Sequence, residues 1–222
     1  GCYKMLTVNA ASGFGSGGGG AVVPATISQT AHAGTGTNNT TTTFSGLSLG
    51  AADAGRIMVC GVAGGQPGTV ETVDIVTIGG VTATEQVVST GTNRPCGIWT
   101  AAVPSGTTGD VVVTFSTSMS FCHVALWRML EGDATATDTD AANGKVDGTL
   151  TIKGGGVAVG FGQNDNTTVT ACSGLTFGDN VSAERETGTS AAAFAANQTE
   201  LSIDFTPADT PGNTSCAFAA FF

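Results

Sequence analysis

The sequence predicts an all-β protein built as an antiparallel two-sheet sandwich of the jelly-roll type. Thr and Val are abundant, and Gly contributes 34 of the 222 residues. Side chains that branch at Cβ favour strands, whereas Gly weakens helices and marks turns. Apolar segments and turn signals alternate roughly every 8–12 residues, a spacing typical of sandwiches and barrels.

The strands expected in the first half of the chain are separated by clear turn signals. Residues 56–63 form a nearly continuous apolar run, as expected of a fully buried strand. Residues 73–78 and 82–88 flank Gly79-Gly80, a signal for a two-residue hairpin. Three more strands are expected at residues 97–103, 110–115 and 121–129.

The second half of the chain repeats this order of strands. Residues 155–161 resemble residues 56–62, and residues 201–205 resemble residues 111–115. In each half a polar loop then leads to an apolar strand that carries a cysteine. The sequence therefore indicates an internal duplication, although short apolar strands can also resemble one another by coincidence.

The predicted organisation is an arm, residues 1–43, followed by one sandwich domain, residues 44–222. The related halves of that domain span about 44–130 and 145–222, and together they form one sandwich of eight or more strands. The core is predicted to contain Ile57, Val59, Trp99, Val113, Phe115, Val159, Ile203 and Phe205.

The predicted arm contains Gly17 to Gly20, a tract with no side chains to bury. After it, Val22, Val23 and Ile27 could pair with a neighbouring subunit as an added strand. A disordered tail explains the same composition equally well. If the arm serves assembly, deleting residues 1–30 should leave the sandwich folded and weaken incorporation into larger structures.

Charge and hydropathy exclude two classes of partner. Only 11% of residues are charged, and seven Lys and Arg against seventeen Asp and Glu give a net charge of −10. Nucleic-acid binding needs clustered cations, so no nucleic-acid partner is expected. No apolar run approaches the ~20 residues of a membrane span, and no membrane partner is expected.

The six cysteines admit two interpretations. Cys60, Cys122 and Cys216 lie within apolar strand patterns, where a free thiol behaves as a small buried hydrophobe. We therefore favour reduced thiols in the core by about two to one over a disulfide framework, because a chain of this length does not need such staples.

No catalytic, cofactor or metal site is predicted. His32 lies in a polar stretch and is expected to be solvated, and His123 is expected to face solvent from its strand. Neighbouring strand residues point to opposite faces, so Cys122 and His123 do not form a nucleophile–base pair. Asp138 and Asp140 have a spacing found in calcium loops, but a solvated acidic loop is the favoured interpretation. These observations predict a protein that is not an enzyme.

Three segments resemble a loose group of virion proteins from tailed bacteriophages, found as head decorations, fibres and tail appendages. They are TFSGLSL at 43–49, VTIGGVTAT at 76–84 and IWTAAVPSGT at 98–107. The resemblance extends over about residues 40–222. It implies a β-sandwich without catalytic residues that assembles with copies of itself and with other virion proteins.

The resemblance also implies a location in the virion, after assembly in the reducing cytoplasm of a bacterial host. The expected function is therefore that of a non-enzymatic structural component, a capsid decoration or a tail or fibre subunit. The alternative is a secreted or cell-surface module that binds carbohydrate or acts as an adhesin. A fixed disulfide or glycan binding favours this alternative, and a symmetric oligomer within a particle favours the virion component.

Overall fold

The computed structural model describes residues 23–222 apart from 37, 67, 69, 90–93, 166, 184 and 209–213. Within these residues the chain forms seventeen strands and no helix, and so contains no helix that could cross a membrane. The strands pair antiparallel throughout and form four sheets, which we call A, B, C and D.

The first half of the chain forms sheets A and B. Sheet A has the order β1-β9-β3-β7-β6, and sheet B has the order β2-β8-β4-β5. Gly79 and Gly80 have φ angles of 58° and 81° and form the predicted turn between β4 and β5. The strands are β1 (Thr26–Thr35), β2 (Asn39–Ser48), β3 (Ile57–Gly65), β4 (Val73–Ile78), β5 (Val81–Thr82), β6 (Thr84–Val88), β7 (Cys96–Ala102), β8 (Thr108–Met119) and β9 (Phe121–Leu130).

The second half of the chain forms sheets C and D. Sheet C has the order β10-β17-β12-β15-β14, and sheet D has the order β11-β16-β13. The strands are β10 (Asp138–Asn143), β11 (Asp147–Ile152), β12 (Val157–Asn164), β13 (Val169–Ser173), β14 (Thr176–Ala183), β15 (Arg185–Ala193), β16 (Gln198–Pro207) and β17 (Thr214–Phe221).

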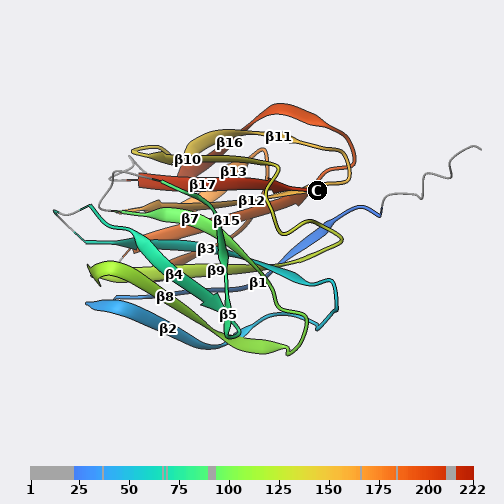
Figure 1. The fold of residues 1–222 in the computed structure, drawn as a ribbon. Coiled ribbons are helices and arrows are strands. Elements are labelled where there is room, and N and C mark those ends of the chain that lie inside the picture. Colours follow the sequence, from blue (N-terminus) through green and yellow to red (C-terminus); the bar gives the residue numbers. More distant parts are fainter. Residues whose placement is uncertain are drawn as a thin grey trace, which may run out of the picture.

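The four sheets stack in the order B, A, C, D, with the second half above the first in Figure 1. Three apolar cores lie between successive sheets. Trp99 and Phe115 belong to the core between B and A, Trp127 and Phe161 to the core between A and C, and Phe205 to the core between C and D. Each half is thus a sandwich of its own, and the two sandwiches share a central core.

The stacking order follows from the hydrophobic pattern of the strands. In β3, β9, β12 and β17 nearly every residue is buried, because these central strands are covered on both faces. In β11 buried and exposed residues alternate strictly, and much of β8 follows the same pattern. Such alternation is typical of a strand with one face in the core and the other in solvent.

The two halves have the same strand order. Each strand of the series β1-β9-β3-β7-β6 has a counterpart in β10-β17-β12-β15-β14, and β2-β8-β4 corresponds to β11-β16-β13. Val59 lies opposite Trp127 in sheet A, just as Val157 lies opposite Phe221 in sheet C. Across the A–C core, β1 contacts β14 while β6 contacts β10, so an approximate two-fold axis relates the halves.

The predicted class, an all-β antiparallel sandwich fold, is confirmed. The prediction assembled the two halves into one sandwich, whereas each half closes into a separate two-sheet sandwich. The reason is that the central strands are apolar on both faces and need a sheet on each side. Of the eight predicted core residues, seven are buried and Ile57 is partly buried.

Several strands begin within the predicted arm or between the two predicted halves. β1 and the start of β2 fall within residues 1–43, and β1 pairs with β9 of its own half along nearly all its length. β10 precedes residue 145 and belongs to the second half. The first sandwich of the described chain thus starts at β1.

Candidate functional site

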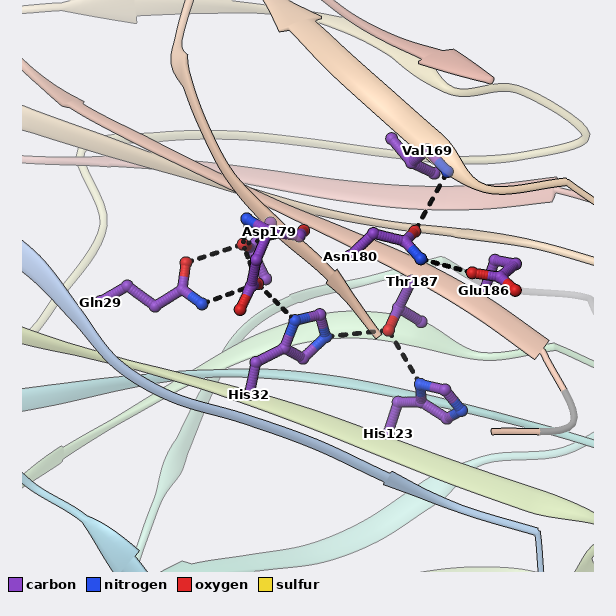
Figure 2. A network of polar contacts seen from close by, with 9 residues as sticks. Gln29, His32, His123, Val169, Asp179, Asn180, Glu186 and Thr187 are labelled. Atoms are coloured by element: carbon purple, nitrogen blue, oxygen red, sulfur yellow. Dashed lines mark hydrogen bonds and ion pairs between the residues drawn. The ribbon is translucent and has the colours of Figure 1, made fainter. Parts of the chain in front are cut away.

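A buried polar network joins the two halves along one edge of the A–C core (Figure 2). His32 from β1 and His123 from β9 approach it from sheet A, and Asp179 from β14 and Thr187 from β15 approach it from sheet C. Because β1 and β14 are the edge strands of their sheets, the network lies at the rim of the shared core.

The hydroxyl of Thr187 lies at the centre of this network. Its Oγ1 is 2.9 Å from Nε2 of His32 and 2.8 Å from Nδ1 of His123. The outer nitrogens of both rings also have partners: Nδ1 of His32 is 2.6 Å from Oδ1 of Asp179, and Nε2 of His123 is 2.9 Å from the carbonyl oxygen of Ala183. A continuous series of four contacts thus runs from Asp179 to Ala183.

Asp179 is the end of the series that reaches solvent. Its side chain is 49% exposed, whereas that of His32 is 1% exposed. Nε2 of Gln29 donates to Oδ1 of Asp179 at 2.8 Å, and Oγ1 of Thr189 donates to the same oxygen at 2.9 Å. A shallow, open depression lies over this carboxylate, lined by residues 29–32 and 178–179.

Two glycines leave room for these side chains. Gly34 lies opposite His123 in the ladder of β1 and β9, and a Cβ added there would lie 2.7 Å from Cε1 of the His123 ring. A Cβ added at Gly178 would lie 2.2 Å from Oε1 of Gln29 and 2.5 Å from Oγ1 of Thr189. Both approaches are too close for any larger residue without rearrangement.

Burial determines the charge state of the histidines. It lowers the pKa of His123 to about 4, a shift that its hydrogen bond to Ala183 and the carboxylate of Glu186 oppose. Burial also lowers the pKa of His32, although Asp179 opposes the shift. Burial opposes ionisation of Asp179, but hydrogen bonds from Gln29, His32 and Thr189, together with the nearby imidazole, lower the pKa of this carboxyl.

Asp179, His32 and Thr187 follow one another in the order of a carboxylate, base and hydroxyl triad. A nucleophile of that kind must reach a substrate from solvent. The side chain of Thr187 is buried, with 0% of the residue exposed, and a second imidazole occupies the other side of its hydroxyl. The arrangement is therefore suited to holding protons and joining the two halves rather than to attacking a bound substrate.

The expected exposure of both histidines was wrong. His123 is buried because sheet C covers the face of β9 that the sequence left to solvent, and the side chain of His32 is buried because β1 lies over β14. The one available signal was that His123 lies in a strand that is apolar on both faces. Nothing in the sequence links His32 to Asp179, which lies 147 residues further along the chain.

A second buried polar centre surrounds Arg56, which is 0% exposed at the start of β3. Its guanidinium donates to five backbone carbonyls: those of Val103 at 2.6 Å, Ser105 at 2.7 Å, Gly50 and Ala51 at 3.1 Å, and Leu49 at 3.2 Å. Arg56 thereby holds the loop after β2 against the loop after β7.

The carboxylates of Asp138 and Asp140, which have a spacing found in calcium loops, bind backbone N–H groups. Oδ2 of Asp138 accepts the backbone N–H of Thr151 at 2.6 Å, and Oδ2 of Asp140 accepts that of Thr149 at 2.9 Å. These bonds connect β10 of sheet C with β11 of sheet D. Among the described residues no group of three or more His, Cys, Asp or Glu side chains is arranged to hold a metal ion.

The five cysteines within the described residues are free thiols. Cys60, Cys96, Cys122 and Cys216 are buried, and Cys172 is partly buried. Burial raises the pKa of each of the five, to about 12 for Cys216. Cys2 lies outside the described residues.

The residues predicted for assembly lie at the start of the described chain. Val22 is outside the described residues, and Val23 is 61% exposed just before β1. Ile27 pairs with Met129 of β9 and packs against the A–C core. Of the described residues in this set, Val23 is thus the one whose side chain is open to a neighbouring subunit.

Comparison of the chain with protein-family models, with curated proteins and with solved structures found no match.

Proposed function

We propose that the protein is a non-enzymatic structural component of a bacteriophage particle, a capsid decoration or a tail or fibre subunit. It assembles with copies of itself and with other virion proteins, through the outer faces of its sandwiches and the segment before β1. The sequence supports this through the segments at 43–49, 76–84 and 98–107, which lie in and around β2, the β4–β5 hairpin and β7.

The observation that carries the proposal is the chemistry of the outer sheet faces. Hydroxyl side chains recur on both outer sheets, and on sheet D the exposed carboxylates of Asp147 and Asp204, which lie opposite each other, stand among them. In sheet B the hydroxyl residues are Thr41, Thr43, Thr77 and Thr114, and in sheet D they are Thr149, Thr151, Ser202 and Thr206. Oγ1 of Thr41 and that of Thr114 lie 3.2 Å apart across neighbouring strands. Hydroxyl groups can both donate and accept hydrogen bonds, so they can contact another subunit without burying charge.

The placement of the reactive side chains supports the same proposal. The imidazoles join the two halves, the guanidinium of Arg56 binds loop carbonyls, and four of the thiols lie within the cores. Free thiols are typical of proteins that assemble in a reducing cytoplasm, whereas secreted adhesins often contain disulfides. The imidazoles, Arg56 and the buried thiols therefore stabilise the fold. The outer sheet faces remain available for contact with other subunits.

Electron microscopy of purified particles from the phage that encodes the chain tests the proposal. Antibodies against the recombinant protein should label the particles at symmetric positions, and a reconstruction should contain four-layered density that fits the chain. Absence of the protein from particles would overturn the assignment, and its recovery from the culture medium with affinity for a glycan array would favour the adhesin alternative.

A further inference from the structure

When both histidines are neutral, the series of contacts between Asp179 and Ala183 has one hydrogen fewer than it has contacts. Its four contacts require four hydrogens, because the carboxylate and the carbonyl at its ends can only accept. Two neutral imidazoles and one hydroxyl supply three. Nδ1 of His32 and Nε2 of His123 must donate to these end groups, so two ring nitrogens without hydrogens face the single hydrogen of Thr187.

One added proton completes the series. It places a hydrogen in the fourth contact and leaves one imidazolium close to the carboxylate of Asp179. A second proton would put an imidazolium on each side of one hydroxyl, whose own hydrogen would then have no acceptor among its partners in the described residues. The closed network therefore accommodates one extra proton, whereas two solvated histidines accommodate two.

The charged groups around the two rings do not change this conclusion. Asp179 on β14 and Glu186 on β15 favour protonated imidazoles, but burial outweighs them and lowers the pKa of both rings. The guanidinium of Arg185 lies 5.7 Å from the centroid of Phe121, whose ring in turn contacts His123 edge to face. Asp165 forms ion pairs with Arg185 and with Arg94, which reduces their net positive charge near the network.

The opposite edge of the A–C core, between β6 and β10, has no histidine among its described residues. There Nε2 of Gln86 on β6 donates to Oγ1 of Thr100 at 2.9 Å, and Oε1 of Gln86 accepts the backbone N–H of Ala136 at 2.8 Å. Oγ1 of Thr100 donates to the carbonyl of Ala134 at 2.6 Å. This amide and hydroxyl contact joins β6 and β7 of sheet A to the segment before β10, and none of its groups titrates near neutral pH.

We propose that mild acid opens the contact between sheets A and C along β1 and β14, through protonation of His32 and His123 around Thr187, while the edge at β6 and β10 stays closed as a hinge. Opening exposes both imidazoles to water and lets each take a proton. It loosens β1, the strand that joins the N-terminal segment to the body. This inference does not depend on the assignment to a phage particle.

The full-length protein allows a direct measurement, since His32 and His123 are its two histidines. Long-range ¹H–¹⁵N spectra of the imidazoles at pH 7.5 should show fixed tautomers, with the hydrogen of His123 on Nε2. In the closed protein His123 should titrate well below the ordinary pKa of about 6.5. A freely averaging tautomer, or an ordinary pKa in the closed state, would overturn the proposal even if no variant can be produced.

Amide hydrogen exchange, corrected for the intrinsic effect of pH, measures the opening itself. Between pH 6.5 and 4.5 protection in β1 and β14 should fall by up to about tenfold per pH unit where the closed network holds one extra proton, and by up to about a hundredfold where it holds none. Protection in β6 and β10 should stay constant over the same range. An equal loss at both edges would show general acid unfolding instead of a hinge.

His123→Gln separates the network from other acid effects. The glutamine amide can donate to Ala183 and accept from Thr187 but does not titrate, so the pH dependence at β1 and β14 should become weaker, with His32 as the one remaining imidazole. Gln86→Ala at the opposite edge is the matched control: it should lower protection at β6 and β10 and leave the pH dependence at β1 and β14 unchanged. An undiminished pH dependence in His123→Gln would contradict the proposal.

Discussion

The ring of Trp127 meets the ring of Phe161 edge to face across the boundary between the two halves, with centroids 6.4 Å apart and planes at 84°. Trp127 belongs to β9 of sheet A and Phe161 to β12 of sheet C, and both residues are 0% exposed. This pair lies in the core that the two sandwiches share. The stability of each half should therefore depend on the other.

Phe161→Ala should lower the free energy of unfolding by about 3–5 kcal/mol, since it removes a buried aromatic ring and leaves a cavity in the shared core. Unfolding in guanidinium, followed by tryptophan fluorescence and by circular dichroism, measures this loss. The wild type should unfold in one transition for both probes. Ile75→Ala on the outer face of sheet B is the control, because Ile75 is 50% exposed, and it should cost less than about 1 kcal/mol. Two separate transitions in the wild type would show that the halves fold independently.

A second prediction compares substitutions of Arg56 and Arg128. Both donate to the carbonyl of Ala51, but Arg56 is fully buried and also binds four other carbonyls. Arg56→Lys keeps the charge and loses the planar group that reaches both loops, so it should cost about 2–4 kcal/mol. Arg128→Lys should cost less than about 1 kcal/mol. Denaturant titration measures both, and equal losses would show that the carbonyl contacts of Arg56 do not stabilise the loops.

The thiols provide a third prediction. Cys60, Cys96, Cys122 and Cys216 are buried with a raised pKa, so iodoacetamide at pH 8 should leave them unmodified in the folded protein. Cys172, which is partly buried, should react slowly. Mass spectrometry of peptides identifies the modified positions, and the same treatment in guanidinium, where every thiol should react, is the control. Disulfide-linked peptides from unreduced protein would contradict the structure at these positions.

The sequence was sufficient to predict the most apolar strands, such as β3, β9 and β12, because their composition reflects their burial, but not β10, β11 or β14, which lie in polar stretches. The hairpin at Gly79-Gly80 and the run at residues 56–63 depend on local chemistry, and both were predicted. The stacking of four sheets could not be predicted in the same way. A strand that is apolar on both faces needs a covering sheet on each side, but its sequence does not specify which sheets these are. The sheet that covers β3 on its second face comes from the other half of the chain.

The same limit applies to the polar network. Gln29 and Asp179 are 150 residues apart, and their contact exists because β1 and β14 are edge strands of two stacked sheets. An isolated His in a polar stretch gives no sign of such a partner. The carboxylates Asp138 and Asp140 bind backbone N–H groups of β11 across a sheet boundary. Only the arrangement of β10 beside β11 distinguishes that role from calcium binding or solvation.

The last prediction concerns the segment before β1. The structure shows where truncations that test this segment should end. Deleting residues 1–30 would remove half of β1, including Gln29, so the informative truncations end on either side of this strand. A protein lacking residues 1–22 keeps β1 and every contact of the network. It should keep its melting temperature and, if the segment serves assembly, lose incorporation into particles.

A protein lacking residues 1–35 serves as the comparison, because β1 pairs with β9 along nearly its whole length and contributes His32 to the network. Its removal exposes the edge of β9 and uncovers part of the A–C core, so the melting temperature should fall by several degrees or more. Differential scanning calorimetry measures the melting, and sedimentation with purified particles measures incorporation. Normal incorporation without residues 1–22 would exclude the segment from assembly, and an unchanged melt without residues 1–35 would exclude β1 from the cooperative fold.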